Sequence, residues 1–254
     1  MGRTVPALTR ALDILELFLD GESHTVPEIT QVLGLPRTSA HELTATLAQR
    51  RYLVVRADKP GHFRLGSPLF QLGAVFEEQL DLAREGRFVS EQVAAACDET
   101  VHVAVLDGTE VLYIAKVDST HPVRLVSAVG RRLPAHCTGV GKMLLAELED
   151  AEFDSRYPPD VELAGMTQHS ITSPAQLKAC LREVSQRGLA YEYCESNSAA
   201  ACVAAPVRDA SSNVVAAMSI SVPTARWDDT SAEELAGHVT TGARELSERL
   251  GHTI

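Results

Sequence analysis

Apolar residues recur at intervals of three and four along the first fifty positions of the chain, which is typical of amphipathic helices. One such stripe covers residues 6–19. Residues 25–28, Thr-Val-Pro-Glu, have the pattern of a capping box with proline in the first turn, and they predict a short second helix that ends at Gly34. A third helix is predicted to start at Pro36, because three apolar residues then share one face at helical spacing, namely Ala40, Leu43 and Leu47.

The opposite face of the third helix is polar and short-chained, with a basic residue at its start. Two helices joined by a tight glycine turn, the second with such a face, are typical of a helix-turn-helix, whose second helix enters the major groove of DNA. Residues 52–55 and 62–65 predict two strands around a turn at 58–61, and therefore a wing. The candidate DNA-binding residues are Arg37, Thr38, Ser39, His41 and Glu42 on the helix and Arg56, Lys59 and Arg64 on the wing. On pattern alone, a three-helix domain with no role in DNA binding fits equally well.

The rest of the chain mixes helical and strand patterns. Residues 67–97 are helical in pattern, and strands are predicted at 101–105 and 110–117 around an Asp107-Gly108 turn. Further strands are predicted at 123–129, 190–195, 202–207 and 214–222, with helices at about 139–147, 174–187 and 230–250. Because strands and helices do not alternate regularly, we expect an α+β fold. The expected parts are a winged helix-turn-helix (1–66), a linker helix (67–82) and a second domain (83–254).

The net charge of −11 for the whole chain argues against a nucleic-acid binder, but the charge is distributed unevenly along the sequence. Residues 1–66 hold eight Lys or Arg against seven Asp or Glu, whereas residues 67–254 hold 15 against 27. We therefore expect phosphate contacts in the first segment. No stretch approaches the roughly 18 consecutive apolar residues of a membrane span, and the first 20 residues are charged where a signal peptide is apolar. A cytoplasmic protein with no membrane contact is expected.

Three features of the sequence could carry catalytic or metal chemistry. The five cysteines are widely spaced and predict neither a disulfide framework nor a zinc site, and no cofactor is expected. Residues 139–143, Gly-Val-Gly-Lys-Met, resemble a P-loop, but His136 stands where the first glycine is required and Met143 stands where Ser or Thr should bind magnesium. His136 and Cys137 resemble a base and a thiol nucleophile, yet neighbours on an extended strand point to opposite faces. Because no complete set of catalytic residues is present, the sequence favours a protein that is not an enzyme.

A ligand site is predicted from two serines and two glycines. Ser219 and Ser221 lie two apart on a predicted strand, so both hydroxyls point to one face. If they are buried they need hydrogen-bond partners, which a polar ligand would supply. Gly139 and Gly141 can expose backbone amides to a carboxylate at a helix start, although close packing of the helix on the sheet explains them equally well. This set of residues needs no cation.

Three parts of the sequence, in order and spread over nearly the whole chain, resemble signatures of the IclR family of bacterial transcriptional regulators. The first consists of residues 7–15, ALTRALDIL, and residues 34–41, GLPRTSAH. The second consists of residues 130–146, GRRLPAHCTGVGKMLLA. The third consists of residues 204–209, AAPVRD, and residues 216–221, AAMSIS. Their order and spacing make the resemblance far more specific than any one motif.

The resemblance implies a winged helix-turn-helix, a linker helix and an effector domain with a GAF-like fold, assembled as a homodimer or a dimer of dimers. It places ligand contacts at Gly139, Val140, Glu192, Cys202, Ser219 and Ser221, with an apolar wall at Leu125, Leu133 and Ala200. Family members often have aspartate at the position of Glu192. They commonly have arginine at the position of Glu42, which here either accepts a hydrogen bond from a cytosine amino group, orients Arg37, or is simply a solvated charge.

The sequence thus predicts a ligand-responsive DNA-binding regulator, with repression of a catabolic operon as the favoured role and a small organic acid or related metabolite as the effector. Two alternatives stay open. One is a small-molecule-processing enzyme with an accessory helix-turn-helix, and the other is an interaction module whose winged helix binds a protein. The interaction module would bind without salt dependence, which separates it from a DNA binder.

Overall fold

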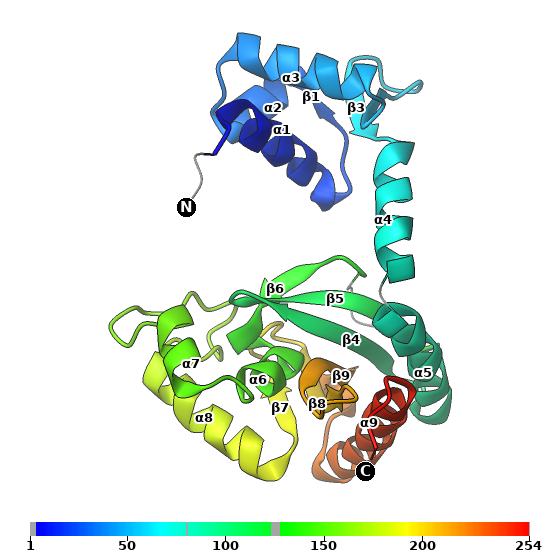
Figure 1. The fold of residues 1–254 in the computed structure, drawn as a ribbon, viewed down its shortest axis with the longest axis vertical. Coiled ribbons are helices and arrows are strands. Elements are labelled where there is room, and N and C mark those ends of the chain that lie inside the picture. The colour runs from blue at the N-terminus through cyan, green and yellow to red at the C-terminus, as the bar shows by residue number, and fades with distance from the viewer. Residues whose placement is uncertain (1–3, 80, 123–127, 254) are drawn as a thin grey trace. The chain divides into compact units, whose positions relative to one another are not determined.

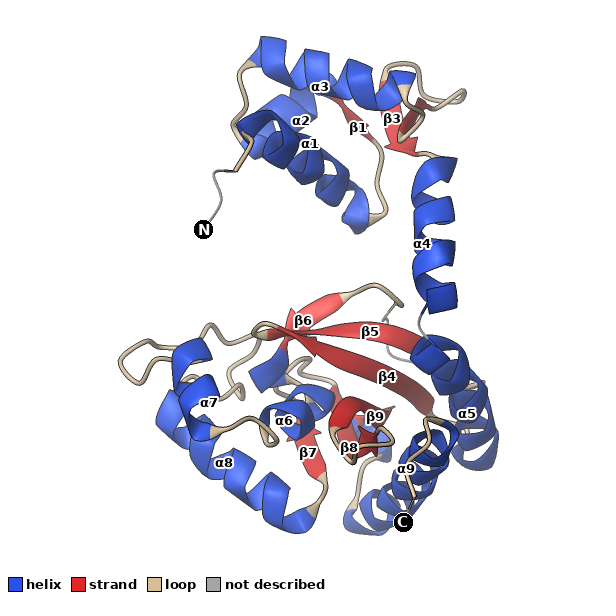
Figure 2. Cartoon of the chain, viewed as in Figure 1, coloured by secondary structure: helices blue, strands red, loops and turns tan. Residues whose placement is uncertain are grey.

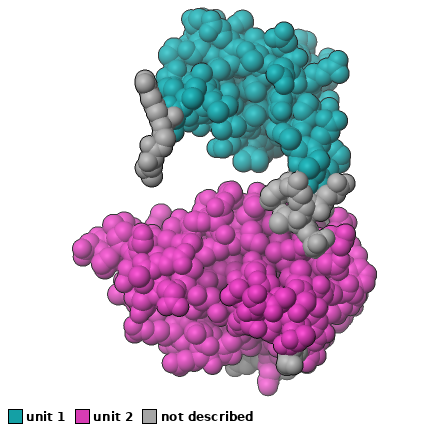
Figure 3. All heavy atoms as spheres, in the orientation of Figure 1, with its two compact units in different colours: residues 1–79 teal, residues 80–254 magenta. Residues whose placement is uncertain are grey.

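The computed structural model of the chain describes residues 4–79, 81–122 and 128–253. The chain divides into two compact units, residues 1–79 and residues 80–254 (Figure 3). The first unit is mainly helical, and the second is built around a large sheet (Figure 2). None of the helices in the described ranges is both long and apolar enough to cross a membrane.

The first unit combines helices with a small antiparallel sheet. Its elements are α1 (Pro6–Leu17), β1 (His24–Thr25), α2 (Val26–Leu33), α3 (Arg37–Gln49), β2 (Leu53–Val55), β3 (His62–Leu65) and α4 (Ser67–Gln79). The strands pair in the order β1-β3-β2. The wing hairpin of β2 and β3 is therefore present as predicted, and β1 adds a strand that the sequence does not predict. The apolar helix faces meet in one core around Ile14, Phe18, Ile29 and Leu53.

The capping box predicted at residues 25–28 starts α2. The Glu28 amide donates to Thr25 Oγ1 at 3.4 Å, and the Thr25 amide donates to the Glu28 carboxylate at 2.7 Å. These bonds satisfy two amides at the helix start, and the bond from the Thr25 backbone is the main cause of a lowered pKa at Glu28. Gly34 ends α2 with a left-handed φ of 60°, and Pro36 caps α3. A short turn thus joins the two helices of the motif.

The second unit contains a six-stranded antiparallel sheet in the order β6-β5-β4-β9-β8-β7. Its strands are β4 (Thr100–Asp107), β5 (Glu110–Val117), β6 (Arg132–Pro134), β7 (Ala190–Tyr193), β8 (Ala200–Arg208) and β9 (Val214–Pro223). Its helices are α5 (Asp81–Cys97), α6 (Gly139–Leu145), α7 (Asp150–Arg156), α8 (Pro174–Arg187) and α9 (Asp229–Arg249). The mixture of helices and antiparallel strands confirms the α+β class.

Four segments of the second unit differ from the prediction. The sequence does not predict β6 or α7, because each is too short to show a clear period. Residues 128 and 129 are not part of a strand, and the rest of the strand predicted at 123–129 lies outside the described residues. Residues 135–137 form a turn of 3-10 helix rather than extended chain.

The sheet carries helices on both faces (Figure 1). The helices α5 and α9 pack together on one face, over Val103 and Met218 among others. The helices α6 and α8 belong to the other face, over the small side chains of Ala104, Ala204 and Ala217. Alternation along β9 sends odd-numbered residues from 217 to 221 toward α6, which decides what a site beneath that helix can contain.

Gly66, between the wing and α4, packs directly against backbone. A Cβ atom there would lie 1.8 Å from the Arg51 carbonyl oxygen. Gly66→Ala is expected to destabilise the first unit by about 1 to 3 kcal/mol, because the wing must shift to remove the overlap. Hydrogen exchange over residues 24–66, followed by mass spectrometry, should become faster. Gly73→Ala is the matched control, since nothing lies within 4 Å of its Cβ position and alanine favours a helix. Unchanged exchange in Gly66→Ala would contradict this packing.

Candidate functional site

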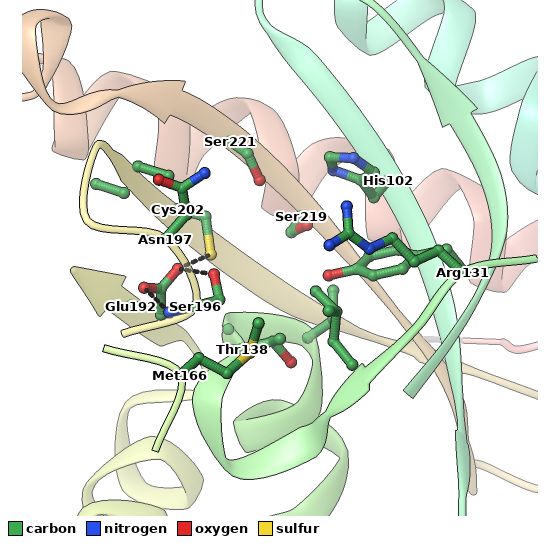
Figure 4. Close-up of a pocket in the computed structure, with 16 residues that line it drawn as sticks. His102, Arg131, Thr138, Met166, Glu192, Ser196, Asn197, Cys202, Ser219 and Ser221 are labelled. Carbon is green, nitrogen blue, oxygen red and sulfur yellow. Dashed lines mark hydrogen bonds between the residues drawn. The ribbon is translucent and has the colours of Figure 1, made fainter. Parts of the chain in front are cut away.

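A pocket opens on the face of the large sheet that α6 covers (Figure 4). It is open to solvent, and both polar and apolar side chains line it, as is usual for small-molecule sites. The residues that the sequence nominates and that line this pocket are Leu133, Gly139, Val140, Glu192, Ala200, Cys202, Ser219 and Ser221. The remaining nominated residue, Leu125, lies outside the described residues.

The sequence interpretation missed several residues of the same pocket, namely His102, Tyr113, Arg131, Thr138, Met166, Ser196, Asn197 and Ala201. The sequence carries a signal for three of them. His102 is a polar residue in an otherwise apolar strand, and Arg131 and Thr138 lie within the family-like segment 130–146. The others come from loops or from positions whose side chains look like ordinary core or turn residues.

The register of the sheet brings the polar residues together. Glu192 on β7 lies opposite Cys202 on β8, and Cys202 lies opposite Ser221 on β9. Ser219, two residues before Ser221, lies opposite His102 on β4. Directly opposed residues in an antiparallel pair share a face with Cβ atoms about 4.5–5.5 Å apart. The polar groups therefore run across four strands on the face beneath α6.

Glu192 gives the pocket an acidic side. Its side chain is 2 % exposed, and its Oε1 accepts hydrogen bonds from the backbone amides of Glu195 and Ser196. Its Oε2 is approached by the Ser196 hydroxyl at 3.3 Å and by the Cys202 thiol at 3.6 Å. Burial raises the pKa of Glu192, and the two amides oppose that shift. The carboxyl group thus holds the loop that follows β7.

A buried ion pair fixes the same loop to α6. Lys142 is 2 % exposed, and its Nζ donates to Glu195 Oε1 at 2.5 Å. The Ser170 hydroxyl donates to the Glu195 carbonyl oxygen at 2.7 Å. A buried ammonium group needs such a partner to offset its desolvation. The lysine of the P-loop-like segment therefore positions Ser196 and Asn197, which line the pocket.

Of the two readings that the sequence leaves open for the glycines, the structure supports close packing for Gly141. The Gly141 amide is not available to a ligand, because it donates to Thr138 Oγ1 at 3.0 Å. A Cβ atom at Gly141 would lie 2.1 Å from the Ala135 carbonyl oxygen, so this glycine permits close packing. Gly139 does line the pocket, and a Cβ atom there would lie 2.6 Å from the Cys202 sulfur.

The two predicted serines face the pocket (Figure 4). Ser219 is 2 % exposed and Ser221 is half-buried. Neither hydroxyl hydrogen-bonds to another residue that the structure describes, so both are available to a ligand. Leu133 and Val140 add apolar walls beside them.

His136 and Cys137 lie in the turn of 3-10 helix, and both side chains are buried. The His136 Nε2 lies 3.1 Å from the Ala164 carbonyl oxygen, and its ring meets Tyr157 edge-on. Burial lowers the pKa of His136 and raises that of the Cys137 thiol. A thiol with a raised pKa is a poor nucleophile, so this pair supports packing rather than covalent chemistry.

All five cysteines are free thiols, and Cys137, Cys194 and Cys202 are buried. Burial raises the pKa of the Cys202 thiol. Within the described ranges, no three or more His, Cys, Asp or Glu side chains are placed to hold a metal ion.

In the first unit, α3 presents the polar face expected of it. The exposed residues are Arg37, Thr38, His41 and Glu42, with Ser39 half-buried between them. Ala40 and Thr44 point into the domain and are fully buried. The predicted polar residues are therefore on the side of α3 that faces away from its own core.

On the wing, Lys59 and Arg64 are exposed. Arg56 is held by Asp58 through two hydrogen bonds, Nε to Oδ1 at 3.0 Å and Nη2 to Oδ2 at 2.5 Å. The bond from Arg56 is the main cause of the pKa of about 2 at Asp58. Because this pair is neutral overall, Lys59 and Arg64 supply the net positive charge of the wing.

Two family models match the chain. The model described as "Bacterial transcriptional regulator IclR C-terminal" matches residues 76–248, and the "IclR helix-turn-helix domain" matches residues 7–57. The chain is 30 % identical over 249 residues to the HTH-type transcriptional regulator KdgR of Dickeya chrysanthemi, over 98 % of this chain and 81 % of that protein. It is 30 % identical over 246 residues to the transcriptional repressor IclR of Escherichia coli (strain K12), over 96 % of this chain and 89 % of that repressor.

Solved structures have the same fold. The Thermotoga maritima IclR structure aligns with a TM-score of 0.77 at 25 % identity, over 97 % of this chain and 99 % of that one. An IclR homolog from Microbacterium hydrocarbonoxydans, complexed with 4-hydroxybenzoate, aligns with a TM-score of 0.79 at 24 % identity, over 96 % and 99 %. The family consists of regulators and not enzymes, so the alternative of an enzyme with an accessory helix-turn-helix is not supported. The chain belongs to the IclR family of bacterial transcriptional regulators, to which its sequence motifs and its two units both point.

Proposed function

We propose that this regulator represses a catabolic operon, that α3 and the wing bind the operator, and that a small organic acid in the sheet pocket changes the affinity for DNA. The observation that carries the proposal is the pocket itself. It combines two serine hydroxyls, neither hydrogen-bonded to any side chain or backbone group within residues 4–79, 81–122 and 128–253, with apolar walls, in a unit separate from the one that presents α3. That division is what a ligand-controlled DNA-binding protein needs.

DNA contact is assigned to the exposed face of α3 and to the wing. Arg37 is placed to bind a guanine edge or a phosphate, and the short side chains of Thr38, Ser39 and His41 allow close approach to bases. Lys59 and Arg64 would bind phosphates beside the groove. Glu42 is exposed among them, where it can accept a hydrogen bond from a cytosine amino group.

The effector is assigned to the pocket beneath α6. The hydroxyls of Ser219 and Ser221 donate well to a carboxylate, while Leu133 and Val140 would enclose a carbon skeleton. Glu192, Cys202, Gly139 and Ala200 complete the walls. The complex of the Microbacterium homolog with 4-hydroxybenzoate, an organic acid, supports this class of ligand.

Control of DNA binding requires two arrangements of the protein that the effector distinguishes. We assign residues 1–66 to DNA binding, residues 67–82 to the linker helix and residues 83–254 to the effector domain. A ligand that favours one arrangement then shifts operator affinity, and operator DNA shifts ligand affinity by the same factor.

A homodimer, or a dimer of dimers, is part of the proposal because one recognition helix covers too few base pairs for useful specificity. The first unit exposes large apolar side chains that suit self-association. Leu8 and Leu12 on α1 are 60 % and 49 % exposed, and Phe70 and Leu72 on α4 are 79 % and 57 % exposed.

Arg37→Ala is expected to weaken operator binding by about 1 to 3 kcal/mol, because it removes a charged contact to a base or phosphate. Gel shifts with the upstream region of the protein's own gene measure the loss. The logarithm of the wild-type affinity should also fall linearly with the logarithm of salt concentration. An affinity that does not change with salt concentration would instead favour an interaction module whose winged helix binds a protein.

Two further variants sharpen this test. Arg244→Ala, on α9 of the second unit, is the matched control and should bind as the wild type does. Asp58→Asn should strengthen binding, because it removes a negative charge from the wing and releases Arg56 for phosphate contact. Weaker binding by Asp58→Asn would argue that the wing does not touch DNA.

Replacing both Ser219 and Ser221 by alanine is expected to weaken effector binding at least about tenfold, since each lost hydrogen bond to a charged group costs roughly 1.5 to 3 kcal/mol. Titration calorimetry with organic acids, beginning with 4-hydroxybenzoate, measures the affinity with and without operator. The double variant Ser185→Ala and Ser211→Ala changes two exposed serines and serves as control. Normal effector binding by the pocket variant, or an effector affinity that operator DNA leaves unchanged, would contradict the proposal.

Light scattering at micromolar concentration should give at least twice the chain mass of 27.4 kDa. Phe70→Glu, which places a charge in the exposed apolar face of α4, should shift the equilibrium toward monomer and weaken operator binding with it. Glu152→Gln on α7 is the control. A monomer that binds a single half-site would count against the dimer.

A further inference from the structure

Arg131 lines the pocket, and backbone hydrogen bonds to β5 fix the position of its main chain. The Gly130 amide donates to the Tyr113 carbonyl oxygen at 2.8 Å, and the Tyr113 amide donates to the Arg131 carbonyl oxygen at 3.1 Å. Gly130 has a φ of +84°, a left-handed conformation that favours glycine, and so turns the chain just before β6. These two bonds extend the ladder of β5 and hold the Cα of Arg131 beside the pocket wall.

The guanidinium group supplies a charge that the rest of the pocket lacks. Among the described residues that line it, Arg131 is the one with a permanent positive charge. His102 also lines the pocket, but burial, helped by the positive charge of Lys116, lowers its pKa to about 4, so its ring is neutral at neutral pH. An anion that enters the pocket therefore finds its opposite charge at Arg131.

The acidic group of the pocket lies on the other side. Figure 4 shows Arg131 entering beside Ser219 and His102, with Glu192 across the pocket from it. A ligand carboxylate beside Glu192 would meet a second carboxyl group, and the ammonium group of Lys142, whose charge acts on Glu192, is already paired with Glu195. The Oε2 atom of Glu192 is contacted by the Ser196 hydroxyl and the Cys202 thiol at the long distances of 3.3 and 3.6 Å. It is therefore suited to accept a hydrogen bond from a hydroxyl or amino group of the ligand.

We propose that Arg131 is a specificity-determining residue that binds the effector carboxylate together with Ser219, and that the effector carries a hydroxyl or amino group at its other end for Glu192. This inference rests on the proposed function, which places an organic acid in the pocket. It adds the orientation of that acid and narrows its class to hydroxy acids or amino acids of a length that spans the pocket. The carbon skeleton then lies over Val140 and Met166.

The first test uses the full-length protein and a panel of carboxylic acids of three to eight carbons, each paired with its own primary amide. Calorimetry should show that wild type binds the acids at least tenfold more tightly than the amides. Arg131→Met should abolish this preference, and Arg131→Lys should retain part of it. Arg132→Met is the matched control, because Arg132 pairs with Asp107 and Glu110 outside the pocket and its loss should leave the preference intact. An undiminished preference for acids in Arg131→Met would overturn the inference.

The second test addresses the other end of the ligand. Hydroxy or amino acids should bind wild type more tightly than parent acids that lack the substituent, and Glu192→Gln should reduce this difference severalfold. Ser196→Ala removes a neighbouring contact to Glu192 and reports whether a loosened loop alone has the same effect. If parent and substituted acids bind wild type equally, the assignment of Glu192 is wrong.

The two proposals fail in different ways. If no acid in the panel binds, or if the variant lacking both Ser219 and Ser221 binds acids normally, the proposed pocket function is wrong. If acids bind and need both serines, but Arg131→Met keeps the full preference for acids over amides, the pocket function stands and this inference is overturned.

Discussion

The antiparallel register of the large sheet is the constraint on which the pocket depends. Because side chains alternate between the two faces of a strand, the same pairing that buries Met218 and Ile220 against α5 and α9 turns Ser219 and Ser221 toward α6. Pairing with β8 and β7 then lines Cys202 and Glu192 up beside them. A slip of one residue would exchange the two faces, so core stability and pocket chemistry are set together.

The second constraint on the pocket comes from charged side chains that are buried beside it. Lys142 and Glu195 form an ion pair inside the domain, and Glu192 is as buried as Lys142. Such groups contribute little net stability, since pairing mainly repays the cost of desolvation, but losing one partner leaves the other charge buried and unpaired. The main effect of these buried charged groups is to fix the position of a loop. They hold the loop after β7 at the edge of the pocket through contacts to Ser196 and to the backbone of Glu195.

Much of the fold follows from the sequence. Helical periods and a capping box located α1, α2 and α3, and a glycine-containing turn between apolar segments located the wing. Long strands such as β5 and β9 were equally visible. The sequence could not reveal β1, β6 or α7, because segments of two to seven residues carry too few positions to show a period, and their structure comes from the partners they pack against.

For the site, the sequence alone determined which family signatures were present and that Ser219 and Ser221 share a face. It could not determine that Gly141 gives its amide to Thr138, because hydrogen bonds to side chains depend on the path of the turn. Nor could it show that Arg131 reaches the pocket, since a loop residue has no periodic face to reveal its direction. Only the tertiary structure decided that a cation and a carboxyl group lie on opposite sides of one cavity. Arg131 and Glu192 are sixty-one positions apart in the sequence, and the order of the six strands brings both to the same pocket.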